Sequence, residues 1–73
     1  YHNEDKHLHE YLSDREFEIF KLIVRGQTLK IIASNLNISD KTVSTYRSRI
    51  MKKMNMVSTS DLIHYAIENN ISD

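Results

Sequence analysis

Basic side chains are concentrated in one short run of this 73-residue chain. Residues 41–53 hold half of its ten lysines and arginines and no acidic residue, although the formal net charge of the whole chain is zero. The five bases of this run are Lys41, Arg47, Arg49, Lys52 and Lys53. Closely spaced cations favour binding to a polyanion such as nucleic acid, because neutralised phosphates release their condensed counterions. A basic helix face is more often only a solvated surface, so the elements that position these side chains must decide between the two interpretations.

Hydrophobic periodicity predicts that the basic run lies on a helix. Apolar residues recur at spacings of three and four, the pattern of a stripe that packs into a core, at Val43, Tyr46, Ile50 and Met54. Short hydroxyl side chains fall on the opposite face between the cations. Serine and threonine hydrogen-bond to base edges and let a helix backbone come close to a groove. Arg47 falls nearer the apolar side, and we expect its stem to follow the helix surface toward solvent or phosphate.

Capping residues divide the chain into four predicted helices. Ser13 and Glu16 have the spacing of a capping box, and Gly26 supplies a left-handed stop for this first helix. The second helix is predicted from the cap Thr28 through residue 36, the third from the cap Ser39 to about residue 54, and the last over about 59–69. Left-handed residues are expected after the last three helices at Asn37, Asn55 and Asn70.

This pattern predicts an all-α fold, a four-helix bundle-like helix-turn-helix domain. The chain has no proline and one glycine, and a tight turn over residues 37–39 separates the second and third helices. In a helix-turn-helix the second of the two helices lies in the major groove of DNA. Many proteins that bind no DNA also contain such a corner, so topology alone does not establish the function.

Several classes of function are not expected. Without cysteine the chain has no disulfide and no thiolate metal site. A metal site at His7 and His9 is not expected, because residues 1–12 are predicted to be a linker or poorly ordered lead-in. No nucleophile, base and oxyanion donors come together in the pattern, so we expect neither an enzyme nor a cofactor. Apolar runs are far shorter than the roughly 20 residues that span a bilayer, so no membrane association is expected.

Over residues 12–71 the sequence resembles the C-terminal DNA-binding domain of the LuxR/FixJ/NarL family of bacterial transcription regulators. The matching positions lie in all four predicted helices: Leu12, Ser13, Arg15, Glu16, Glu18, Ile19, Leu22 and Gly26 in the first, Ile32, Ala33 and Leu36 in the second, Ile38, Ser39, Lys41, Thr42, Val43, Tyr46, Ile50, Lys53 and Met54 at the third, and Asp61, Leu62, Tyr65 and Ala66 in the last. Within the family, VSTYRSRIMKKMN at residues 43–55 is similar to response regulators of the BvgA and EvgA kind.

The resemblance implies a cytoplasmic effector domain of a bacterial two-component regulator, covering residues 13–73, with a receiver domain before residue 1. It implies base-facing positions at Lys41, Ser44, Thr45 and Ser48. Positions at or near the DNA backbone are expected at Lys30, Thr42, Arg49, Lys52 and Lys53, and Arg47 joins them through its expected reach toward phosphate. Several family members carry lysine where Ser44 and Ser48 stand, so the target sequence is not transferable.

The partners expected on this basis are double-stranded DNA, a second copy of the chain and RNA polymerase. A dimer contact through the last helix is predicted at Leu62, Ile63, Ala66 and Ile67, although these residues suit an ordinary core equally well. The competing function is a helical protein-interaction module without DNA binding. It is motivated by the apolar last helix and by an apolar spot on the second helix at Leu29 and Ile31.

Overall fold

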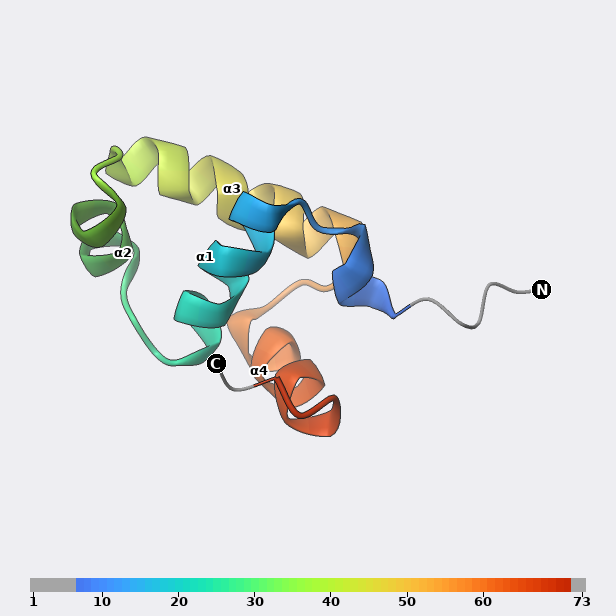
Figure 1. Cartoon of the computed structure of the whole chain (residues 1–73). Coiled ribbons are helices and arrows are strands. Elements are labelled where there is room, and N and C mark those ends of the chain that lie inside the picture. The colour runs from blue at the N-terminus through green and yellow to red at the C-terminus, as the bar shows by residue number, and fades with distance from the viewer. Residues whose placement is uncertain (1–6, 72–73) are drawn as a thin grey trace.

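The structure is a computed structural model, and it describes residues 7–71. Within these residues it contains a short 3-10 helix, four α-helices and no strand, which confirms the predicted all-α fold (Figure 1). The 3-10 helix η1 covers Leu8–Tyr11, and the α-helices are α1 (Asp14–Val24), α2 (Leu29–Leu36), α3 (Asp40–Lys53) and α4 (Thr59–Glu68).

The residue types at the helix ends explain these boundaries. Each α-helix begins after a hydroxyl side chain that accepts a hydrogen bond from a backbone N–H of the first turn, as predicted for Ser13, Thr28 and Ser39 and as also observed for Ser58. The predicted left-handed residues also have positive φ angles, 58° at Asn37, 56° at Asn55, 57° at Asn70 and 92° at Gly26. Small polar or absent side chains tolerate this conformation, so the four helices end where the sequence indicates.

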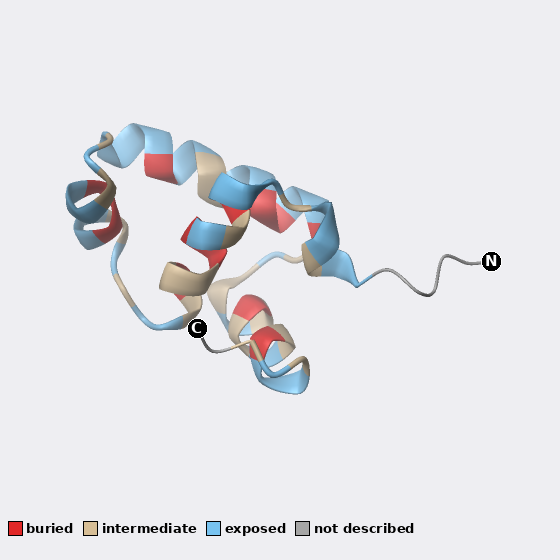
Figure 2. Ribbon diagram, in the orientation of Figure 1, coloured by how far each residue is buried: buried red, intermediate tan, exposed pale blue. Residues whose placement is uncertain are grey.

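Helix α1 forms the centre of the domain. It packs against α2, α3 and α4, while α2 also packs against α3 (Figure 1). Buried side chains from all four α-helices meet there (Figure 2). The fully buried ones are Ile19 and Phe20 from α1, Ile32 from α2, Val43 and Ile50 from α3, Met54 at the end of α3, and Leu62 from α4. The predicted stripe on α3 is confirmed at Val43, Ile50 and Met54, whereas Tyr46 is only partly buried.

The turn between α2 and α3 places the two helices as a helix-turn-helix. The left-handed conformation of Asn37 turns the chain, and the N–H of Ile38 donates to the carbonyl of Ala33 at 3.0 Å. Ile38 packs against the core, and Ser39 then caps α3. Because these contacts hold both ends of the turn, the position of α3 relative to α2 and the core is fixed.

The second half of the predicted lead-in differs from the expected linker. Residues 1–6 lie outside the described residues, but residues 7–12 have a defined conformation that includes η1. The physical reason is a contact with α4: the Nδ1 of His9 lies 2.8 Å from the hydroxyl of Tyr65, and the backbone N–H of His9 donates to the same oxygen at 3.2 Å. The His9 ring also stacks on Phe17 at 5.6 Å between centroids.

Candidate nucleic-acid interface

Helix α3 lies at the edge of the molecule, and most of its residues are exposed (Figure 2). The four predicted base-facing residues, Lys41, Ser44, Thr45 and Ser48, are all exposed. Of the predicted backbone-contacting residues, Lys30, Thr42, Arg49, Lys52 and Lys53 are exposed, and Arg47 is partly buried. The structure therefore brings most of the predicted set to one side of α3, with Lys30 on neighbouring α2.

The cations on this surface differ in the partners they already have. Among residues 7–71, Lys30, Lys41 and Lys52 form no ion pair within the domain. The guanidinium of Arg49 lies 5.8 Å from the ring centroid of Tyr46, a cation–π contact that leaves its charge uncompensated by any acid. These four cations are available to an external anion.

The hydroxyl groups near the start of α3 are partly engaged by the helix itself. Thr45 Oγ1 donates to the carbonyl of Lys41 at 3.1 Å, so toward solvent it offers lone pairs and a methyl group. Thr42 Oγ1 lies 2.8 Å from the Oγ of the cap Ser39, which also accepts from the Thr42 N–H at 3.0 Å. Ser44 and Ser48 have no such bond within residues 7–71, so their hydroxyls are free to rotate toward a base edge.

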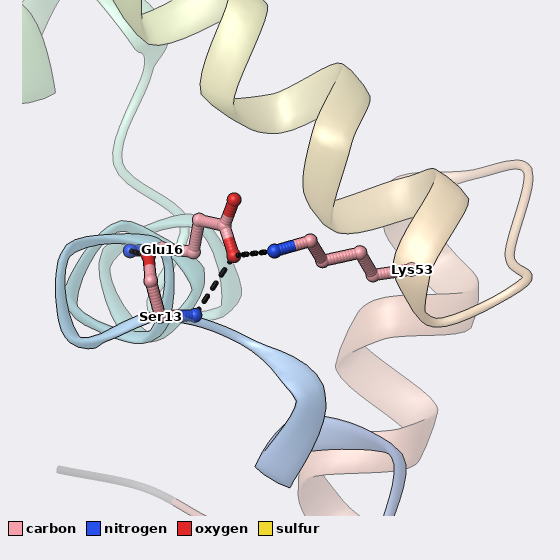
Figure 3. Close-up of polar contacts among 3 residues, drawn as sticks. All are labelled: Ser13, Glu16 and Lys53. Atoms are coloured by element: carbon pink, nitrogen blue, oxygen red, sulfur yellow. Dashed lines mark hydrogen bonds and ion pairs between the residues drawn. The ribbon is translucent and has the colours of Figure 1, made fainter.

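Lys53 is not one of these available cations, because its side chain already has a partner within the domain. Its Nζ lies 2.7 Å from Glu16 Oε1, and the same oxygen accepts from the backbone N–H of Ser13 at 2.8 Å (Figure 3). The capping box predicted from Ser13 and Glu16 is therefore present and extends to the last turn of α3. Lys53 serves to fasten α3 to α1, a role that differs from the predicted backbone contact.

Glu16 has a larger structural role than the predicted capping box alone would give it. Only 4% of it is exposed, although a capping-box acid usually lies on a surface. Burial raises the pKa of the Glu16 carboxyl, but the hydrogen bond and charge of Lys53, together with the hydrogen bonds from Ser13, outweigh this effect and lower the pKa below its ordinary value. The carboxylate is thus held ionised in the folded protein.

Replacing Glu16 with glutamine is expected to flatten the dependence of stability on acid pH. Since the folded-state pKa of Glu16 is lowered, the unfolded chain binds its proton first, and the free energy of unfolding falls as the pH drops from about 5 through the ordinary value of about 4.3 toward the folded-state pKa. Glu16→Gln removes this contribution. Urea denaturation followed by circular dichroism across this pH range measures it.

The matched control for this measurement is Glu18→Gln. Glu18 lies on the same helix, and its side chain is 50% exposed in an i,i+3 pair with Arg15 at 3.2 Å, an exposed pair that contributes little to stability. Equal flattening in both variants would contradict the special role of the buried Glu16.

Arg47 is also turned away from the outer side of α3. Its Nη2 donates to Thr59 Oγ1 in the first turn of α4 at 3.0 Å. The helical wheel places Arg47 near the apolar side, as observed, but the sequence pattern gives no indication that a threonine of another helix would receive its guanidinium.

The predicted dimer surface on α4 needs correction. Leu62 is fully buried and Ala66 is 4% exposed, because both pack into the core against α1. They cannot touch a second chain in this fold. Ile63 is partly exposed and Ile67 is 71% exposed, so these two remain on the outside of α4.

The apolar spot predicted on α2 is smaller than expected. Leu29 is partly buried and packs against the core, whereas Ile31 is 49% exposed. A single exposed isoleucine is ordinary on a protein surface. One of the two observations that motivated a protein-interaction module is therefore weakened.

Residues 7–71 have none of the features of several other kinds of site. No group of three histidine or acidic side chains lies in a position to hold a metal ion. No pocket is found, and no α-helix of this region has the length and apolar character that crossing a bilayer requires.

The comparison with known proteins agrees with the helix-turn-helix geometry. The family model described as bacterial regulatory proteins of the luxR family matches residues 10–66, most of the chain. The chain belongs to this luxR family. The resemblance inferred from the helix positions is thereby confirmed, and no solved structure matches the chain.

Individual relatives from this luxR family carry names that concern regulation. A Pseudomonas aeruginosa protein named as a transcriptional regulator is 51% identical over 57 residues, 78% of this chain and 28% of that protein. BvgA of Bordetella pertussis, whose name concerns positive transcription regulation of virulence factors, is 40% identical over 68 residues, 93% of this chain and 32% of BvgA. The response regulator UvrY of Escherichia coli is 40% identical over 60 residues, 82% of this chain and 28% of UvrY. The chain thus spans less than a third of each of these relatives.

Proposed function

We propose that this chain is the sequence-specific DNA-binding effector domain of a bacterial two-component transcription regulator. Membership of the luxR family supports this function, and the observation that carries it is the outer side of α3, where uncompensated cations surround exposed hydroxyl groups next to the helix-turn-helix corner. A module that only bound other proteins would not need this arrangement, so it is not favoured. As part of a bacterial regulator, the domain would act in the cytoplasm with RNA polymerase as a further partner.

In the proposed complex α3 lies in the major groove of double-stranded DNA. Lys41, Ser44, Thr45 and Ser48 face base edges, where hydroxyl groups donate or accept and the Thr45 methyl can touch a thymine methyl. The groups assigned to the DNA backbone are Lys30, Thr42, Arg49 and Lys52, which are all exposed. Lys53 and Arg47 have protein partners instead, so they contribute to the support of α3.

A second copy of the chain is proposed to pack against the exposed side of α4 through Ile63 and Ile67. Ile63 is partly exposed and Ile67, one turn further along α4, is 71% exposed, so the two leave apolar surface on the outside of this helix. Two copies joined in this way would present two α3 helices to paired half-sites on one side of the duplex.

Selection of bound duplexes from a random pool tests the proposal most directly. We expect paired half-sites with centres about 10 base pairs apart, as for two recognition helices on one face of the duplex. Titration of the selected duplex at several salt concentrations should show a steep fall in affinity. A chain that shows no salt dependence and no preference over random duplex would disprove DNA recognition, whereas unpaired half-sites would disprove the dimer alone.

Two single substitutions should separate the proposed contacts. Lys52→Ala should weaken binding to all duplexes alike and reduce the salt slope by about one, because a phosphate contact carries no sequence information. Thr45→Ala should chiefly alter the preferred base at one position. Thr45→Ser separates the two groups of this side chain, since it keeps the hydroxyl and removes only the methyl group that can touch a thymine methyl. Selection and titration of each variant measure both effects, and an altered base preference in Lys52→Ala would reverse the assignment.

A further inference from the structure

Arg47 of α3 forms a direct hydrogen bond with α4. Both helices pack against α1, which lies between them, and they have few direct contacts with each other (Figure 1). Within residues 7–71, the hydrogen bond from Arg47 Nη2 to Thr59 Oγ1 at 3.0 Å is the one that joins the two helices directly. A charged donor strengthens such a bond.

The position of Arg47 on α3 keeps its side chain off the groove-facing side. It lies four residues from both Val43 and Met51, which are 0% and 9% exposed. Residues four apart lie above one another on a helix, so Arg47 continues a buried row. Its partly buried stem and its bond to Thr59 direct the guanidinium toward α4.

The receiving residue lies on the part of α4 proposed to meet a second chain. Thr59, Ile63 and Ile67 are spaced by four residues, so they form one row along α4. Ile67 is 71% exposed at the far end of this row. Arg47 therefore joins the helix proposed to read DNA to the first residue of the row proposed to form the dimer.

We infer that Arg47 is a positioning residue that fixes α3 relative to the contact row of α4 and thereby sets which half-site spacing the dimer accepts. This inference rests on the proposed function. In a two-fold dimer, a change in the angle between α3 and α4 is applied twice, once in each copy, and so changes the distance between the two recognition helices.

The test compares binding to one half-site with binding to two half-sites whose separation changes by single base pairs. Arg47→Met keeps much of the apolar stem and removes every donor, and Thr59→Val removes the accepting hydroxyl without changing the charge. We expect both variants to retain affinity for a single half-site, to bind the preferred paired spacing about tenfold more weakly, and to discriminate less between neighbouring spacings. The double variant should be no weaker than either single variant, because both remove one bond.

Two matched variants serve as controls for this test. Arg49→Met removes the same charge from the outer side of α3 and should weaken all duplexes while reducing the salt slope by about one. Thr59→Ser retains the hydroxyl and should keep the spacing profile of the unmodified chain. Circular dichroism of each variant checks that the domain is folded.

Two results would overturn the inference alone. One is an unchanged spacing profile in folded Thr59→Val. The other is an Arg47→Met variant that behaves like Arg49→Met, which would make Arg47 a phosphate contact. If the unmodified chain binds no duplex at all, the proposed function itself fails, and the inference fails with it.

Discussion

Simultaneous replacement of Lys30, Arg49 and Lys52 by alanine should remove most of the salt dependence of DNA binding. These three cations are the ones proposed to contact the DNA backbone, and they have no acidic partner within residues 7–71, so in the complex they are free to neutralise phosphates. Each neutralised phosphate contributes about 0.9 to the slope of log affinity against log salt concentration. Between about 50 and about 200 mM salt, three such contacts account for a loss of roughly 40-fold that the triple variant should not show.

Fluorescence anisotropy with the selected duplex at several salt concentrations measures this difference. The control removes the same number of charges outside α3, by alanine at Arg15, Lys21 and Arg25. This control has the same net charge as the triple variant and should keep nearly the whole slope. Equal slopes in the two variants would show that overall charge, and not the proposed backbone contacts, determines binding.

Replacing Phe20 with alanine should greatly lower the free energy of unfolding of the protein. Phe20 is fully buried on α1, with its ring centroid 5.9 Å from that of Phe17 and 6.4 Å from that of Tyr65 on α4. Loss of a buried phenylalanine costs about 3–5 kcal/mol, because the transfer free energy is lost and a cavity remains. A domain of 73 residues has a total stability of roughly 4–11 kcal/mol, so this single change removes a large share of it.

Urea denaturation followed by circular dichroism measures the free energy of unfolding of this variant. Ile31→Ala on α2 is the control, because Ile31 is 49% exposed and its loss should change stability by about 0.5 kcal/mol or less. A small effect of Phe20→Ala would mean that the packing of α1 against α4 is not the centre of the core.

The fold was predictable because interactions between residues close in the sequence determine where each helix begins and ends. Each helix start is determined by a hydroxyl and an N–H three residues away, and the helix ends follow from residues that tolerate positive φ. The stripe of Val43, Ile50 and Met54 is equally local, since helical periodicity alone places these residues on one side. The exposed residues of α3 follow from the same periodicity, so the surface proposed to face DNA was predictable as well.

The contacts that could not be predicted join residues far apart in the sequence. Lys53 and Glu16 are 37 positions apart, His9 and Tyr65 are 56 apart, and Arg47 and Thr59 are 12 apart on different helices. Helical periodicity describes each side chain relative to its own helix axis and carries no information on where a neighbouring helix passes. For the same reason the sequence could not distinguish Leu62 and Ala66, which face the core, from Ile67, which faces outward.

The shared oxygen of Glu16 also has a consequence for how this domain gains and loses structure. One carboxylate oxygen accepts from the N–H of Ser13 at the start of α1 and from the ammonium of Lys53 at the end of α3. Unravelling the last turn of α3 therefore removes a partner of the group that caps α1, and fraying of α1 removes the anchor of α3. The two helix ends should open together as one cooperative unit, so local fraying would not be confined to either end alone.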